Sequence, residues 1–92
     1  MDAAHRALRR LKPTDTSPNS LQKTFDKMEN LFHTIELAGT KPEGEVYSSI
    51  IFKKFPEDMV LEIRKKQMKE SLTLQEIRDL LKNLIFVSLI LH

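Results

Sequence analysis

The chain contains no cysteine, which excludes disulfides, thiolate metal sites and a cysteine nucleophile. It has only two glycines and four prolines, and a multi-stranded sheet normally needs more of these turn-forming residues. Neither glycine belongs to a phosphate-binding loop, and no serine lies in a G-x-S-x-G elbow. These absences favour helices over strands, and we expect neither an enzyme nor a cofactor.

A strong excess of one charge is also missing. The net charge is +2, which is too small to identify a nucleic-acid-binding protein by itself. With 92 residues, of which 40% are hydrophobic and 30% charged, the chain fits one small globular domain.

No apolar run is long enough to cross a membrane. Residues 84–91 are almost wholly apolar, but this run is far shorter than the ~20 residues that a spanning helix needs. At the N-terminus, Arg9 and Arg10 interrupt any signal-peptide core. A transit peptide is an alternative for this basic start, but Asp2 and the lack of nearby serine favour a surface helix. We therefore expect no membrane contact and a cytoplasmic location.

The clearest helix is expected over residues 18–38. Ser17 can act as its N-cap, with Ser20 as an alternative, and Pro18 suits the first helical position. Gly39 is a natural helix stop. One apolar stripe at the helical period follows the cap, with spacings of four, three, four and three: Leu21, Phe25, Met28, Phe32 and Ile35.

The remaining sequence predicts further helices separated by proline-containing breaks. A short helix is expected over residues 3–11, followed by a linker around Pro13. Another should run from residue 43 or 45 to residue 54, although residues 50–52 also suit a strand. Pro56 ends it and opens a helix whose last turn carries residues 64–66. Thr73 and Glu76 form a capping box, so the last helix should begin at Leu74.

The expected fold is therefore all-α, a small bundle of four to five helices. One helix is long, two short helices flank a proline corner, and one is C-terminal. Residues 1–17 form a short helix and linker, and residues 18–92 form the main helical domain.

Candidate metal-binding and catalytic residues are few. The three histidines, His5, His33 and His92, are far apart, and no expected helix carries two of them. His33 lies between Glu29 and Glu36 and is interpreted as solvated or ion-paired. The close acidic pairs, at residues 43 and 45 and at residues 57 and 58, fall at helix starts, where favourable interaction with the helix dipole explains them. We expect no metal site and no small-molecule substrate.

Two features suit contacts with macromolecules. Basic residues form two clusters that could contact phosphate, although a solvated face with helix C-capping is the preferred interpretation. They are Arg6, Arg9, Arg10 and Lys12, and Arg64, Lys65, Lys66 and Lys69. The C-terminal run is apolar all round and must be covered by this domain, a partner or a second copy. Its candidate interaction residues are Leu84, Ile85, Phe86, Val87, Leu89, Ile90 and Leu91.

Residues 21–66, followed by residues 72–85, resemble the Gag-like region of Pao-type (BEL/Pao) retrotransposon polyproteins. The features that carry the resemblance, in order, are a long helix ending at Leu37-Ala38-Gly39, the segment 50–52, the Phe55-Pro56-Glu57 corner and the capped stretch 73–81. Phe55 stands where that family usually has leucine. The apolar end and the lack of a cysteine–histidine zinc knuckle are further departures, so the chain looks like a fragment.

The resemblance implies a non-enzymatic, capsid-type domain that associates with itself. Two alternatives remain open from the residues. One is a basic helical domain that binds RNA or DNA through Arg6, Arg9 and Arg10 with residues 64–66. The other is an adaptor that binds a helix of another protein through its apolar C-terminus.

Overall fold

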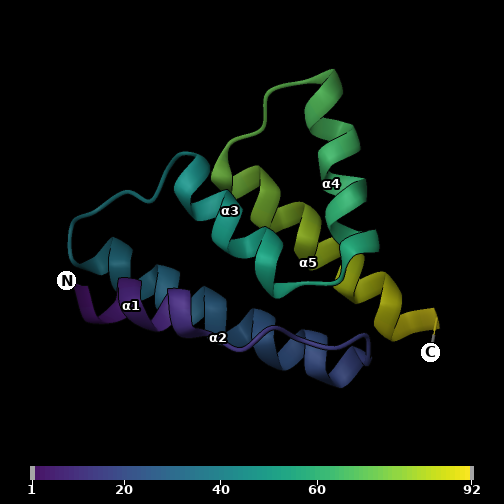
Figure 1. The fold of residues 1–92 in the computed structure, drawn as a ribbon, viewed down its shortest axis with the longest axis horizontal. Helices are drawn as coiled ribbons and strands as arrows, with labels where there is room; N and C mark the ends of the chain where they lie inside the picture. Colours follow the sequence, from purple (N-terminus) through teal and green to yellow (C-terminus); the bar gives the residue numbers. More distant parts are fainter. Residues whose placement is uncertain (1, 92) are drawn as a thin grey trace.

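A computed structural model describes residues 2–91, with side chains from residue 3 onward, and shows five helices (Figure 1). The described residues contain no strand, so the predicted all-α bundle is confirmed. In chain order the helices are α1 (Asp2–Arg10), α2 (Pro18–Leu37), α3 (Glu45–Lys54), α4 (Glu57–Lys69) and α5 (Leu74–Leu91).

The long helix α2 begins and ends where its local signals place it. The Ser17 hydroxyl accepts a hydrogen bond from the backbone N–H of Ser20 at 3.2 Å, and Pro18 lies at the first helical position. Gly39 takes a positive φ of 89° directly after the helix, a conformation that glycine adopts without strain. All five residues of the predicted apolar stripe are buried. The Ser17 cap, rather than Ser20, is therefore the one used.

Helix α1 and the linker after it pack onto the rest of the protein. Leu8 of α1 is fully buried in the same core as the stripe of α2. His5 meets the Tyr47 ring edge-on, with centroids 5.4 Å apart. The Lys54 ammonium donates to the carbonyl of Arg9 at 2.7 Å, and the N–H of Thr14 donates to the carbonyl of Lys54 at 2.9 Å. Residues 2–17 are therefore built into the same packed body as the domain that follows.

Helices α3 and α4 meet at the predicted proline corner. Residues 50–52 are helical, so the strand alternative was wrong. Ile50 and Ile51 are buried in the shared core, and this packing outweighs their preference for strands. Phe55 is buried at the corner, and Pro56 precedes the first residue of α4. Helix α4 continues to Lys69, one turn beyond its predicted last turn at residues 64–66.

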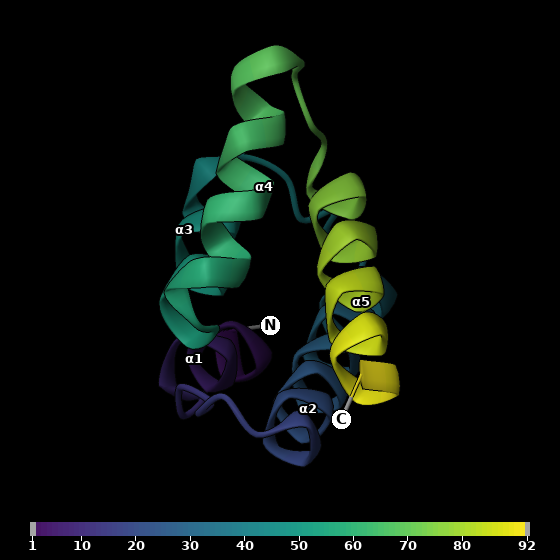
Figure 2. The same ribbon diagram turned by 90° about the vertical axis from the view of Figure 1, so that its right-hand side faces the viewer.

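Helix α5 closes the bundle by packing against α2 and α4. Its buried residues come from α5's first two-thirds: Leu74, Ile77, Arg78, Leu81 and Ile85. Figure 2 shows α4 and α5 standing opposite each other above α1 and α2, joined by the connection at residues 70–73. The C-terminal end of α5 projects beyond its neighbours (Figure 1).

Candidate interaction surface

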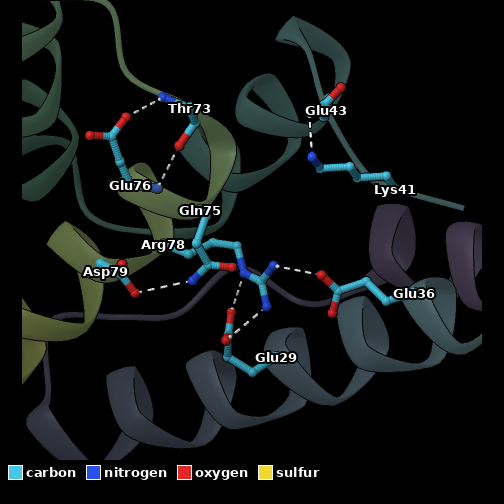
Figure 3. Close-up of polar contacts among 9 residues, drawn as sticks. All are labelled: Glu29, Glu36, Lys41, Glu43, Thr73, Gln75, Glu76, Arg78 and Asp79. Carbon is cyan, nitrogen blue, oxygen red and sulfur yellow. Dashed lines mark hydrogen bonds and ion pairs between the residues drawn. The ribbon is translucent and has the colours of Figure 1, made fainter.

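The position of α5 is fixed first by its capping box, which the structure confirms (Figure 3). The N–H of Glu76 donates to the Thr73 hydroxyl at 3.1 Å, and the N–H of Thr73 donates to the Glu76 carboxylate at 2.9 Å. The backbone hydrogen bond from Thr73 lowers the pKa of Glu76 below its ordinary value. The start of α5 is therefore set by local hydrogen bonds, as the sequence predicts.

A buried arginine then fastens α5 to α2 (Figure 3). Arg78 is only 7% exposed, and its guanidinium donates two hydrogen bonds to the Glu29 carboxylate, at 2.7 and 2.9 Å. A third contact of 3.6 Å reaches Glu36, and the guanidinium lies 4.5 Å from the centre of the Phe32 ring. Glu29, Phe32 and Glu36 lie on one side of α2, so this cluster joins the two helices across their interface.

These partners stabilise the positively charged form of Arg78. Burial alone would lower the pKa of Arg78, but the hydrogen bonds and charge of Glu29, together with Glu36, raise it above its ordinary value. The contacts of Arg78 with Glu29 and Glu36 were not predicted from the sequence. A signal was present, because Leu74, Arg78, Leu81 and Ile85 follow one another at spacings of four, three and four, which places Arg78 on the core-facing stripe. His33 lies between the two carboxylates in sequence, but it is exposed.

The apolar end of α5 is divided between the core and the surface. Ile85 is 1% exposed, so it belongs to the core and offers no surface to a partner; Leu84 is half-buried. The remaining predicted interaction residues are exposed: Phe86 (61%), Val87 (49%), Leu89 (36%), Ile90 (63%) and Leu91 (79%). Neighbouring helices thus cover one face of α5 as far as Ile85 and leave these five large side chains open.

A furrow runs beside this exposed end, between α4 and α5. Its larger part has a volume of about 460 Å³, with Ile63, Leu80 and Leu84 as apolar lining. Lysines and glutamates surround that part: Glu62, Lys65, Lys66, Lys69 and Glu70. A second hollow of about 220 Å³ shares Glu62 and Leu84 and continues toward Val87 and Ser88. We call these two hollows together the α4–α5 furrow.

The structure divides the second predicted basic cluster. Arg64 lies over the Phe52 ring of α3, 4.7 Å from its centre, whereas Lys65 and Lys66 line the α4–α5 furrow. In the first cluster, Arg6, Arg9 and Arg10 of α1 are exposed, and the Arg9 carbonyl contacts Lys54 of α3. Through Lys54 and Phe52, α3 connects the end of α1 with Arg64. The second cluster is therefore divided between the side of α4 that faces Phe52 and the α4–α5 furrow.

The sequence predicted neither a metal site nor catalysis from the histidines and the close acidic pairs. Across residues 2–91, no group of three or more histidine, cysteine or acidic side chains is arranged to hold a metal ion; His92 lies outside the described residues. Asp58 accepts a hydrogen bond from the N–H of Met59 in the first turn of α4, and Glu43 forms an exposed ion pair with Lys41 at 3.4 Å. None of the described helices combines the length and the apolar character needed to span a bilayer.

Comparisons with known proteins give no relative on which to base a function. No protein family, no curated protein and no solved structure matches the chain. The resemblance to Gag-like regions therefore stays a prediction. The surface at the end of α5, which its own fold leaves uncovered, is the feature from which a function is argued.

Proposed function

We propose that this protein is a non-enzymatic helical interaction domain that associates with copies of itself through the exposed end of α5. The observation that carries the proposal is the group of five exposed apolar side chains at residues 86, 87, 89, 90 and 91. A capsid-type assembly role, as the resemblance to Gag-like regions of Pao-type retrotransposons implies, is one form of this function.

The size of the exposed group supports an interface of modest area. Together the five side chains expose on the order of 500 Å² of apolar surface, comparable to the largest patch on a typical monomer, which is often functional. Covering this surface with an equal area of a second copy buries about 1,000 Å² in total, near the lower limit for a specific protein interface. We therefore expect association that is weak in dilute solution and depends strongly on concentration.

The rigidity of the base supports the same proposal. The capping box and the Arg78 cluster hold the first two turns of α5, and Leu81 and Ile85 pack its middle into the core. The exposed end therefore continues a helix that is already positioned. A preorganised surface loses less conformational entropy on binding than a flexible one. Residues 83–91 contain no charged side chain, so no side-chain charge has to be removed from water when this end is buried against another copy.

Sedimentation velocity over a concentration series, from about 1 µM to about 1 mM, tests this proposal. We expect the mean sedimentation coefficient to rise with concentration. The Phe86→Gln/Ile90→Gln variant should stay monomeric at concentrations where the unaltered chain associates. A matched control, Leu61→Gln/Met68→Gln, removes two exposed apolar side chains of α4 and should associate normally. A chain that remains monomeric throughout the series would contradict the proposal.

A second candidate function, binding of RNA or DNA, is favoured by one observation. Lys54 of α3 joins α1, which carries Arg6, Arg9 and Arg10, and Phe52 of α3 stacks with Arg64. Phosphate contacts release counterions, so this function requires affinity for RNA that falls steeply as salt increases. An RNA titration at two salt concentrations checks it, and weak binding with no salt dependence would remove this candidate.

A further inference from the structure

We propose that the α4–α5 furrow of one copy receives the end of α5 from a second copy, so that copies join head to tail. The inference rests on the proposed function, because it takes self-association through the end of α5 as its starting point. It adds the site on the second copy and the type of assembly that results.

Helix α5 carries two different apolar surfaces. Phe86 and Ile90 are four residues apart and share one face of the helix. Leu80, Leu84 and Val87 follow at spacings of four and three and share another face, which lines the furrow. At roughly 100° per residue, the two faces lie about a third of a turn apart. Two different surfaces that fit each other produce a heterologous contact, which extends into a chain of copies.

The furrow also has a lining that suits an apolar helix end. Its larger part has a volume of about 460 Å³ and is open to solvent, so it is a groove rather than an enclosed pocket. Leu80 and Leu84, both partly buried, provide apolar contact on α5, whereas Ile63 of α4 is 1% exposed and belongs to the core beside them. An amphipathic helix that lays its apolar face into such a groove is a common mode of recognition. Phe86 and Ile90 supply a face of this kind.

The charged residues around the furrow are also compatible with an apolar helix end. Three lysines and two glutamates line the furrow: Lys65, Lys66, Lys69, Glu62 and Glu70. Lys65 pairs with Glu62 at 3.6 Å and Lys66 pairs with Glu70 at 4.0 Å, and both ion pairs are long and exposed. Such pairs are weak and leave lysines available to an incoming group. Residues 83–91 contain no charged side chain, so the incoming end of α5 brings no cation that would repel these lysines. Their long apolar stems can lie along the apolar helix while the ammonium groups stay in water.

The furrow is tested by variants that leave the end of α5 unchanged. Leu80→Glu places a charge on the apolar lining, and Lys66→Glu/Lys69→Glu reverses two exposed charges beside it. The control Lys23→Glu/Lys27→Glu reverses two exposed charges of α2. We expect both furrow variants to weaken association by at least about tenfold in sedimentation velocity, and the control to associate normally. If circular dichroism shows that Leu80→Glu does not fold, the lysine variant decides.

Mixing variants distinguishes head-to-tail assembly from a symmetric contact. The Phe86→Gln/Ile90→Gln variant keeps an intact furrow, and the furrow variants keep an intact α5 end. Each should be monomeric alone, whereas an equimolar mixture should form dimers of one copy each and nothing larger.

Two results would overturn the inference while leaving self-association standing. One is a furrow variant that associates as strongly as the unaltered chain. The other is a mixture of folded variants that stays monomeric although the unaltered chain associates. If the unaltered chain itself is monomeric, the proposed function fails first, and the inference fails with it.

Discussion

Residues 74–85 and residues 86–91 belong to one helix and are both rich in leucine and isoleucine, yet their surroundings are opposite. In the first segment, Leu81 and Ile85 are buried, and the one buried charge, Arg78, is paired with Glu29. In the second segment, Phe86 and Ile90 are more than half exposed. The difference arises because α5 continues beyond the helices that cover its first segment (Figure 1).

The comparison shows that apolar composition alone does not determine burial in this helix. The apolar side chains of the first segment are buried and stabilise the fold, whereas those of the second segment are exposed to water, which is unfavourable for apolar surface. We infer that the second segment is covered in the assembled state. Substitutions in the two segments should therefore separate stability from association.

The largest difference is expected between two isoleucines of α5. Ile85→Ala should lower the free energy of unfolding by about 2–5 kcal/mol, because it leaves a cavity in the core. Ile90→Ala should change it by less than about 0.5 kcal/mol, because that side chain is 63% exposed. Urea denaturation at low protein concentration checks both values. Equal effects at the two positions would show that the segments do not differ as described.

A smaller loss is expected from the Arg78 cluster. Arg78→Met keeps an unbranched apolar stem but leaves Glu29 without its two hydrogen bonds, and should destabilise the fold by about 1–3 kcal/mol. The Glu29 side chain is 31% exposed, so water replaces part of the lost interaction. A double-mutant cycle with Glu29→Gln isolates the pair. Strictly additive effects would contradict the direct contact.

The smallest effect, and one that depends on pH, is expected at the capping box. The pKa of Glu76 is lowered in the folded protein, so its carboxylate stabilises the fold at neutral pH. That contribution is lost as pH falls from the ordinary value of 4.5 through the lowered pKa. The stability difference between the unaltered chain and Glu76→Gln should therefore shrink in acid, which thermal unfolding at several pH values can measure. A difference that grows in acid would mean the opposite shift.

Much of the fold could be predicted from local signals in the sequence. Ser17, Gly39 and Pro56 fix helix ends through backbone geometry and capping, and Thr73 with Glu76 fixes the start of α5. These signals act within a few residues, so they do not depend on the rest of the chain. The helix boundaries were therefore the best predicted part of the structure.

Features that depend on tertiary contacts were not predicted. The pairing of Arg78 with Glu29 joins residues 49 positions apart, and nothing local to either residue specifies it. The burial of Leu8 depends on how α1 packs on α2. Within the candidate surface, composition grouped residues 84–91 together, but only the packing of α5 separates buried Ile85 from exposed Phe86.

The central claim, that α5 has a core segment and an interface segment, is tested most directly by amide hydrogen exchange at low and high protein concentration. We expect residues 86–91 to exchange more slowly as concentration rises, because association covers and stabilises the last turns. Residues 74–85 should be well protected at both concentrations. Exchange in residues 86–91 that is equally fast at low and high concentration would contradict the account.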